Sequence, residues 1–552
     1  MQSPAPEILQ LIKDKLIDEC PLSVLEISGY DEMFGKLILD YPTSVPQSDL
    51  SQKTLIVDRV DLSDGVISIA DNIYDCVYSS DYLLNTDSMN EYDLIIVFHL
   101  FENMIDTEAK SLLISLLTKV VRQVLVITPV YSYDLSADEG FSKIRSYHPI
   151  FFLGMDFSYS CIENTDPVMQ YYSFFPKIVY QKLPCDFLPK TIKATDYPRK
   201  LKIAYVLPNQ HLTGCIKSML YQMKEMTLRG HTVIAYFQSD DATSAIPEWS
   251  NFKGDDFSGQ IVFPKSADPA EYIVDADIVF LGWMQQVPKF RNFNIPVVLW
   301  EQGSEYIFGD YLGKKEYEVN FRSQMQLIYR MPVHLLSVSE TIRTALRERY
   351  NRESQLFPLA IDTDLYYPLE QKNNEVPIIL LVGNPILKFK GILDYAFPIL
   401  HMAGQAGLKF KVWWASQTKV EGLHDSDALE MFILPTQEQL AGLFRKADIL
   451  LSTSLYESFS LPPLEAMASG TAVIATDNGG INSYAKPGVN CILCDQGDKE
   501  SVVAALDYLI NNPTVRNLLA VEGRKTALEY SFSNVVPKLE QCLYNILATE
   551  NQ

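Results

Sequence analysis

Short apolar runs that alternate with helical segments recur along the whole chain. Such runs, bounded by polar residues, are typical of strands buried on both faces of a parallel sheet. Parallel strands need a crossover between them, usually a helix, so the alternation predicts α/β domains with helices on both faces of the sheet. Four strands are expected in the first part of the chain, at Val24–Ile27, Thr54–Val57, Asp93–Val97 and Val124–Ile127.

The alternating pattern starts afresh after a polar, proline-containing stretch, Lys190–Lys200. A chain of 552 residues with a hydrophobic fraction of 47% is long enough to bury several cores. We expect three α/β domains, at residues 1–190, 199–345 and 346–530. The second and third should form a tandem pair with a cleft between them, and ligands favour the carboxyl ends of the strands that face such a cleft.

The charge balance restricts the partners of the chain. Its 69 acidic and 46 basic residues give a formal charge of −23, which would repel nucleic acid and anionic lipid surfaces. The most apolar stretch, Leu112–Val130, is interrupted by Lys119 and Arg122, so no membrane span is expected. The N-terminus lacks the order of residues of a signal peptide, and we expect a cytoplasmic protein.

Eight cysteines are scattered along the chain without the regular spacing of a disulfide framework. Cys491 and Cys494 form a C-x-x-C, but they lie in an apolar run with no second pair and no histidine nearby. We expect buried thiols there rather than a zinc or redox site.

The most informative stretch is Leu455–Gly470, which reads LYESFSLPPLEAMASG. Ser460 is expected to cap a helix that has two prolines in its first turn and that ends at Gly470. Glu457 then lies in the loop before the helix, and Glu465 lies one turn inside it. Both carboxylates should therefore lie near a helix N-terminus, whose free N–H groups suit an anionic ligand.

A nucleotide-sugar offers hydroxyls to such carboxylates and phosphates to such N–H groups. Two glutamates eight residues apart are weak evidence alone, since roughly two such pairs are expected by chance at a glutamate frequency of about 6%. The stretch as a whole resembles the signature EGFGLPxLEAMAxGxPVI of family 4 (group 1) glycosyltransferases, with Ser458 and Ser460 in place of the two glycines. Flanking segments extend the resemblance over roughly residues 200–550.

The resemblance implies a GT-B fold, in which two Rossmann-like domains face a cleft and a terminal segment, here 531–552, crosses back to the first of them. It also implies a nucleotide-diphosphate sugar as donor and retention of the anomeric configuration. Glu457 would then position the donor sugar and Glu465 its ribose. Lys390 would neutralise the leaving diphosphate in place of a metal ion.

Further donor-binding positions follow from the same resemblance. The arginine usual in the family is absent; Asn384 stands near its place, and Lys388 is a candidate for the second charge. The complete expected substrate-binding set, besides Glu457 and Lys390, is Gly214, Asn384, Lys388, Ser458, Phe459, Ser460, Leu461 and Glu465. No metal is assigned, because the three D-x-D patterns are expected by chance in so acidic a chain.

The acceptor side departs from the family pattern. Gly214 remains in the loop that is usually glycine-rich, and Cys215 replaces what is often a second glycine. Glu301 and Gln302 follow a strand where many relatives carry a histidine. Either residue faces the acceptor, or the loop only shapes the cleft.

The first 190 residues resemble a class I S-adenosylmethionine methyltransferase more weakly. Asp58 and Asp81 occupy the places that bind ribose and adenine, but Ser28 and Tyr30 replace two glycines of the methyl-donor loop. Bare backbone is normally needed there for the cofactor to approach. We expect a degenerate domain, kept for acceptor binding or assembly, that does not bind S-adenosylmethionine.

The leading hypothesis is a retaining glycosyltransferase of polysaccharide biosynthesis that needs no cofactor and acts on a glycan, protein or small-molecule acceptor. Two alternatives stay open: a bifunctional methyltransferase-glycosyltransferase, and a non-catalytic subunit that supports an active partner. The sequence identifies neither the sugar nor the acceptor, and it leaves homo-oligomerisation open.

Overall fold

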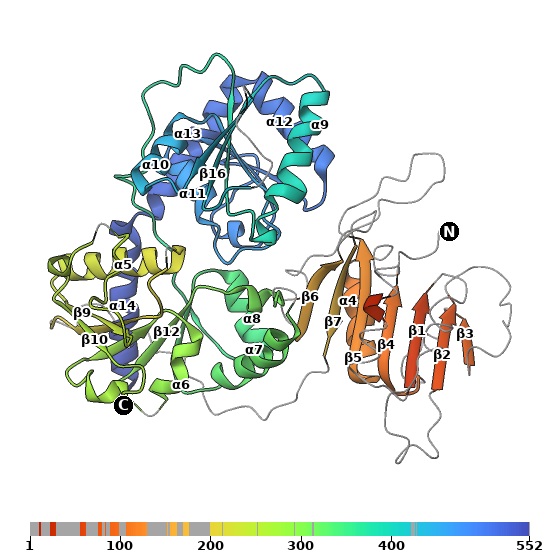
Figure 1. The fold of residues 1–552 in the computed structure, drawn as a ribbon, viewed down its shortest axis with the longest axis horizontal. Helices are drawn as coiled ribbons and strands as arrows, with labels where there is room; N and C mark the ends of the chain where they lie inside the picture. The colour runs from red at the N-terminus through yellow and green to blue at the C-terminus, as the bar shows by residue number, and fades with distance from the viewer. Residues whose placement is uncertain are drawn as a thin grey trace. The chain divides into compact units, whose positions relative to one another are not determined.

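The computed structural model describes 10–12, 23–28, 56–61, 76–79, 83, 89–98, 106–129, 152, 155–162, 169–175 and 199–550, except 212, 251, 292, 312, 313, 421–425 and 427. The chain forms two compact units, and Figure 1 shows its elements by their labels. The first unit consists of Met1–Gln181 and Phe308–Val319, and the second of Lys182–Ile307 and Asn320–Gln552.

The first unit contains a seven-stranded sheet with the order β3-β2-β1-β4-β5-β7-β6. Strand β7 runs antiparallel to its neighbours β5 and β6, and the other neighbouring pairs are parallel. Its elements are β1 (Ser23–Ser28), β2 (Ile56–Asp61), β3 (Cys76–Ser79), β4 (Tyr92–Phe98), α4 (Asp106–Leu117), β5 (Val120–Pro129), β6 (Phe157–Ile162) and β7 (Met169–Phe174).

Three of the four strands expected here are confirmed in β1, β4 and β5. The other lies further along the chain than expected, because β2 begins at Ile56 and continues to Asp61. Tyr30 and Asp81 lie outside the described residues. The first unit therefore has the expected α/β character, whereas its proposed cofactor loop is not described.

A glycine joins the segment Phe308–Val319 to strand β6. Gly309 has a φ of +74°, and a Cβ at this position would lie 2.6 Å from the ring of Phe157. Its carbonyl oxygen accepts a hydrogen bond of 2.7 Å from the N–H of Tyr159. The left-handed backbone and the close approach both require glycine at this point.

The second unit begins with a seven-stranded parallel sheet of order β10-β9-β8-β11-β12-β13-β14. Helix α5 (Gly214–Leu228) connects the first two strands in sequence and is followed by Gly230 with a φ of +89°. The strands are β8 (Lys202–Leu207), β9 (Thr232–Gln238), β10 (Gly259–Phe263), β11 (Ile278–Leu281), β12 (Val297–Glu301), β13 (His334–Ser337) and β14 (Gln355–Leu356).

A second parallel sheet follows, with the order β17-β16-β15-β18-β19-β20. The order reverses between β15 and β18, and ligands of such sheets bind at the carboxyl ends of the strands beside this reversal. Its elements are β15 (Ile378–Val382), α9 (Phe397–Gln405), β16 (Lys411–Ser416), β17 (Leu429–Ile433), α10 (Gln437–Lys446), β18 (Ile449–Ser452), α11 (Leu461–Ala468), β19 (Ala472–Thr476), β20 (Ile492–Cys494), α12 (Lys499–Asn511) and α13 (Pro513–Glu529).

The helices and strands expected around the glutamate motif are confirmed in α10, β18, α11 and β19. Cys491 and Cys494 are buried free thiols, and burial raises the pKa of Cys491 to about 11. Their burial agrees with the expectation of core cysteines.

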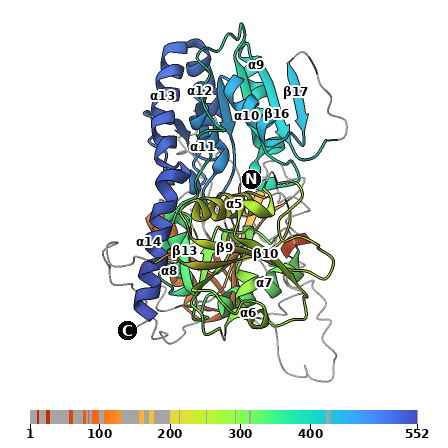
Figure 2. The same cartoon turned by 90° about the vertical axis from the view of Figure 1, so that its left-hand side faces the viewer.

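Helix α14 (Phe532–Glu550) follows α13 and lies along the seven-stranded sheet of the second unit (Figure 2). The ring of Phe532 stacks on Tyr221 of α5 with centroids 4.9 Å apart. Further along the helix, Glu540 pairs with Arg229 and His231. Among the helices that the structure describes, none is both long and apolar enough to cross a membrane.

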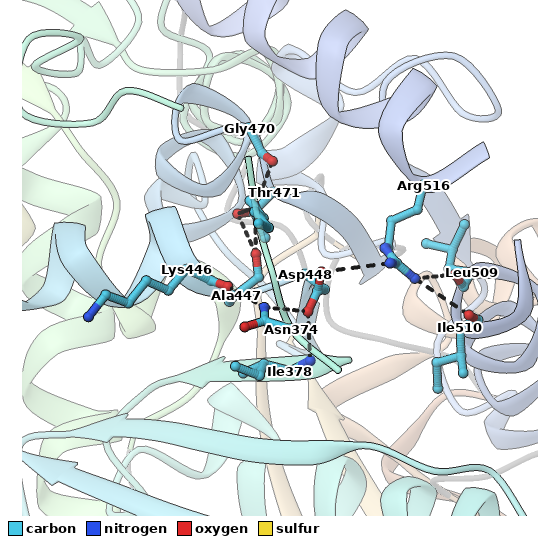
Figure 3. Close-up of polar contacts among 11 residues, drawn as sticks. Asn374, Ile378, Lys446, Ala447, Asp448, Gly470, Thr471, Leu509, Ile510 and Arg516 are labelled. Atoms are coloured by element: carbon cyan, nitrogen blue, oxygen red, sulfur yellow. Dashed lines mark hydrogen bonds and ion pairs between the residues drawn. The ribbon is translucent and has the colours of Figure 1, made fainter. Parts of the chain in front are cut away.

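A buried carboxylate, Asp448, fixes the amino ends of β15 and β18 (Figure 3). It accepts hydrogen bonds of 2.9 Å from the N–H of Ile378 and 2.8 Å from the Nδ2 of Asn374. Its other oxygen lies 3.7 Å from the guanidinium of Arg516. Because this network lies at the amino ends of the strands, it supports the sheet from the side opposite the carboxyl ends.

Lys372 ties the ends of two helices together in the same region. Its Nζ donates to the carbonyl oxygens of Ala447, just after α10, and Gly470, just after α11, at 2.5 and 2.8 Å, and to the Oγ1 of Thr471 at 2.8 Å. Burial lowers the pKa of Lys372 to about 8, against the nearby charge of Asp448. Carbonyl oxygens at a helix C-terminus lack hydrogen-bond donors within the helix, and Lys372 is the donor to two of them here.

Candidate donor site

Glu457 lies in the loop between β18 and α11, at the carboxyl end of the second sheet. Its N–H donates to the carbonyl oxygen of Asn478, 2.8 Å away, and the backbone forms a bridge with Gly479 in the loop after β19. Its Oε1 accepts a 2.9 Å hydrogen bond from the Oγ of Ser454. With 13% of its side chain exposed, Glu457 is held in place but still open to a ligand.

The Nζ of Lys390 lies 2.5 Å from the Oε1 of Glu457. Lys390 ends the short helix Lys388–Lys390, which follows β15. The structure therefore brings together the two residues that were expected to be catalytic.

The loop that carries Lys390 is fastened to the loop after β18. Gly391 has a φ of +63°, and a Cβ on it would clash with the carbonyl oxygen of Thr453. The Oγ1 of Thr453 donates to the carbonyl oxygen of Gly391 at 3.1 Å, and the N–H of Leu455 donates to that of Phe389 at 2.7 Å. Close backbone contact explains why glycine follows Lys390.

The expected capping role of Ser460 is wrong. Ser460 does precede α11, but its φ of +60° places it in the left-handed region, and its side chain makes no capping hydrogen bond. Instead its Oγ accepts a hydrogen bond of 3.3 Å from the Nδ2 of Asn478. An L-residue pays a conformational cost there, and this is a position at which the family pattern has glycine.

The neighbouring positions are equally crowded. Phe459 is fully buried against Tyr484 and Tyr530, so only its backbone is available to a ligand. A Cβ at Gly480 would lie 2.6 Å from the N of Phe459. A Cβ at Gly303 would lie 2.5 Å from that of Ser458. Residues 458 and 459 can therefore lie this close to Gly303 and Gly480 only because those two residues have no side chain.

Two helix N-termini meet at Gly214 and Leu461. A Cβ on Gly214, the first residue of α5, would touch the Cδ1 of Leu461, the first residue of α11, at 3.4 Å. The Oγ1 of Thr213 caps α5 by accepting from the N–H of Ile216 at 3.3 Å. Two converging N-termini concentrate free N–H groups and positive helix-dipole ends, a favourable setting for a phosphate.

Glu465, one turn inside α11, pairs with a residue that the sequence analysis missed. Its Oε1 lies 3.0 Å from the Nζ of Lys217 on α5, and the two side chains are 7% and 18% exposed. Lys217 also donates to the Oη of Tyr366 at 3.2 Å. In the sequence, only its place three residues after Gly214 points to Lys217 as a site residue. An ordinary surface lysine could occupy the same place.

Asn384 and Lys388 are placed differently from Lys390. The Oδ1 of Asn384 accepts from the Oγ1 of Thr418 at 2.9 Å, and its Nδ2 donates to the Oε1 of Gln417 at 3.3 Å. Asn384 is thus turned towards the loop after β16. Lys388 is exposed on the same short helix as Lys390.

Glu301 is occupied by its own loop. Its Oε2 accepts from the Oη of Tyr329 at 2.7 Å and its Oε1 from the N–H of Gly303 at 2.8 Å. Burial raises the pKa of Glu301, against the effect of these two hydrogen bonds. Gln302 donates from Nε2 to the Sγ of Cys215 at 3.0 Å, while its buried Oε1 has no hydrogen-bond partner among the described residues. Of the two acceptor-side candidates, Gln302 retains a free acceptor atom.

Sequence comparisons agree with the geometry of the second sheet. Residues 418–526 match the family model described as "Glycosyl transferases group 1". An MMP alpha-(1->4)-mannosyltransferase of Mycolicibacterium hassiacum is 30% identical over 32% of this chain and 45% of its own length. A D-inositol 3-phosphate glycosyltransferase of Corynebacterium urealyticum is 34% identical over 28% and 37%. The chain thus spans less than half the length of these curated relatives.

Solved structures match the fold over a longer range. A sucrose-phosphate synthase from Thermosynechococcus elongatus aligns with a TM-score of 0.52 at 15% identity, over 63% of this chain and all of the other. HepE of Anabaena, in complex with UDP-glucose, aligns with a TM-score of 0.51 at 14% identity, over 62% of this chain and 99% of the other. The solved structures thus show a GT-B fold, and residues 418–526 match the group 1 glycosyltransferase family model.

Proposed function

We propose that the protein transfers a sugar, with retention of anomeric configuration, from a nucleotide-diphosphate sugar to the hydroxyl of a glycan, protein or small-molecule acceptor. The observation that carries the proposal is the Lys390–Glu457 pair at the carboxyl end of the sheet. The transfer breaks the bond between the anomeric carbon and the diphosphate and forms a bond to the acceptor oxygen. The acceptor proton and the nucleoside diphosphate leave as the other products.

The leaving diphosphate develops negative charge, and the site has groups suited to receive it. Lys390 supplies a cation, and the N-termini of α5 and α11 supply free N–H groups close by. Glu457 accepts hydrogen bonds from the hydroxyls of the donor sugar, and the backbone N–H groups of residues 458–460 face the same sugar as donors. Glu465 accepts from the ribose. In this arrangement a lysine takes the place of a metal ion at the diphosphate.

The acceptor is proposed to approach from the side of α5 and β12. Gln302 offers a buried carbonyl oxygen that has no hydrogen-bond partner in the described part of the chain, and a hydroxyl donor would satisfy it. Glu301 instead holds the loop through Gly303 and Tyr329. The acceptor is therefore proposed to be a compound with a hydroxyl group that donates a hydrogen bond to Gln302.

Purified protein incubated with a panel of UDP-, GDP- and TDP-sugars tests this function directly. We expect slow hydrolysis of one donor, measured as release of the nucleoside diphosphate, and loss of that release in Glu457→Gln. Binding without hydrolysis of any donor, even with candidate acceptors present, would favour a non-catalytic subunit. No binding of any donor would contradict the proposal.

For the first unit we propose a degenerate methyltransferase-like domain that serves acceptor binding or assembly. Its seven-stranded sheet, with the single reversed strand β7 between β5 and β6, fits the resemblance to class I methyltransferases. We expect calorimetry to detect no binding of S-adenosylmethionine at about 1 mM, the weak end of ordinary ligand affinity. A micromolar isotherm would support the bifunctional alternative instead.

A further inference from the structure

Three segments that are distant in sequence meet at the carboxylate of Glu465. Lys217 reaches it from α5, 248 residues away, at 3.0 Å. Tyr366, in the segment between β14 and β15, contacts the same lysine through its Oη at 3.2 Å, and its ring lies 5.2 Å from the Nζ of Lys217. Glu465 comes from α11. The pair therefore links the domain that contains α5 to the one that contains α11.

The side chain of Glu465 is buried against a positively charged partner, Lys217. The side chain of Glu465 is 7% exposed, and a carboxylate at so buried a site needs a partner. Tyr366 is almost fully buried, and its pKa is raised well above its usual value, first by burial and then by the charge of Glu465. Its hydroxyl thus remains a neutral donor, and Lys217 supplies the positive charge.

A small pocket beside this pair is lined by Lys217, Glu465, Tyr221, Asp362, Leu461 and Phe532, among others. Leu461 is the first residue of α11, next to the converging helix N-termini. A ligand with a phosphate at those N-termini and a hydroxylated ring next to it would bring its hydroxyls towards Glu465.

We propose that Lys217 is a positioning residue that holds the carboxylate of Glu465 oriented to accept hydrogen bonds from the ribose hydroxyls of the donor nucleotide. The inference rests on the proposed function, because it assumes a nucleoside diphosphate at the helix N-termini. Lys217 acts through Glu465 and does not itself contact the ribose. The domain containing α5 thereby contributes to nucleotide affinity through a residue of the other domain.

Paired nucleotides separate this role from a purely structural one. UDP and GDP are each compared with their 2′,3′-dideoxy forms by calorimetry on the full chain. In the wild type we expect the hydroxyl-bearing form of the preferred nucleotide to bind about tenfold more tightly or better, as a charged acceptor contributes more than a neutral one. In Lys217→Met this ratio should fall to within about threefold, with affinity for the dideoxy form unchanged.

Three further variants sharpen the comparison. Lys217→Arg should keep most of the ratio, because it retains the charge. Tyr366→Phe removes one hydroxyl from a packed ring and should lower the ratio by a smaller factor, which gives a second readout if Lys217→Met folds poorly. Lys224→Met is the matched control, since Lys224 lies on the same helix but pairs with Asp256 at 3.6 Å; its ratio should equal that of the wild type.

The outcomes distinguish the two proposals. An equal loss of affinity for both nucleotide forms in Lys217→Met would show a structural salt bridge and overturn the inference. A wild type that binds nucleoside diphosphates without regard to the ribose hydroxyls would also overturn it, while the proposed function would stand. A wild type that binds no nucleoside diphosphate would refute both.

Discussion

The Nζ of Lys390 lies 2.5 Å from the Oε1 of Glu457, so the expected cation of the diphosphate site and the expected carboxylate of the sugar site neutralise each other. A donor molecule has to compete for both partners. Its diphosphate draws Lys390 away from Glu457, and the freed carboxylate can then accept from a sugar hydroxyl. The pair thus gives each charge a partner while both side chains are mostly buried, with Lys390 18% and Glu457 13% exposed.

This competition predicts opposite effects of Glu457→Gln on binding and turnover. The amide no longer neutralises Lys390, so the nucleoside diphosphate should bind as tightly as to the wild type or more tightly. Turnover should fall by about 100-fold or more, the usual effect of losing a group that stabilises developing charge. Calorimetry with the nucleoside diphosphate and initial rates with the donor measure the two effects.

Glu430→Gln is the matched control, because Glu430 is exposed on strand β17 of the same sheet. It should change neither quantity. Full turnover by Glu457→Gln with the true donor and acceptor would refute the role of Glu457.

Much of this fold and part of this site follow from sequence patterns. Apolar runs, the two prolines in the first turn of α11 and Gly470 after its end predicted the position of this helix, because such signals depend only on neighbouring residues. The ion pair of Lys217 with Glu465 was not predictable, since it joins side chains 248 residues apart on two different helices, α5 and α11. Ser460 was misread because a serine before a helix usually caps it, whereas the tight loop here imposes a left-handed backbone.

Lys390→Ala should weaken the nucleoside diphosphate as well as slow turnover. Lys390 faces the expected diphosphate in the ground state and in the transition state alike, so its loss affects both. We expect the dissociation constant to rise about tenfold or more, the typical effect of losing a charge-assisted hydrogen bond. Lys388→Ala, at an exposed lysine of the same short helix, should have a smaller effect. The reverse order would assign the diphosphate to Lys388.

A lysine at the diphosphate also predicts activity without a divalent cation. Lys390 neutralises charge that a metal ion would otherwise have to neutralise. Donor hydrolysis should therefore continue in excess EDTA at the untreated rate. Loss of activity in EDTA and its recovery with Mg²⁺ or Mn²⁺ would contradict this prediction.

The backbone at Gly391 predicts a specific glycine requirement. Gly391→Ala should destabilise the protein by about 1–3 kcal/mol, because φ is +63° and the new Cβ would meet the carbonyl oxygen of Thr453. Gly404→Ala in α9 is the control, because a Cβ there meets no atom of the residues that the structure describes within 4 Å. It should be neutral or stabilising by up to about 1 kcal/mol. Thermal unfolding of both variants tests the contrast, and equal destabilisation would argue against strain at Gly391.

The stability of the protein at low pH should depend on His231, which contacts helix α14 through Glu540. Its Nδ1 accepts a hydrogen bond of 3.1 Å from the N–H of Leu201, so the ring proton lies on Nε2, which donates to Glu540 at 2.8 Å. Burial is the main cause that lowers the pKa of His231 from 6.5; Lys200 and Arg229 also lower it, and Glu540 opposes them. Protonation would set a second N–H against that of Leu201.

The folded protein therefore binds fewer protons at His231 than the unfolded chain does below pH 6.5. Stability should fall as the pH decreases from about 7.5 to about 5.5, because the unfolded state takes up the proton first. Glu540, whose pKa is lowered from 4.5 by its hydrogen bonds to Arg229 and His231 against the effect of burial, stays ionised in this range and does not contribute. Thermal unfolding at the two pH values measures the slope. His231→Gln should reduce it, and His401→Gln, at an exposed histidine of α9, should leave it unchanged. A slope that persists in His231→Gln would mean that other groups control the acid response.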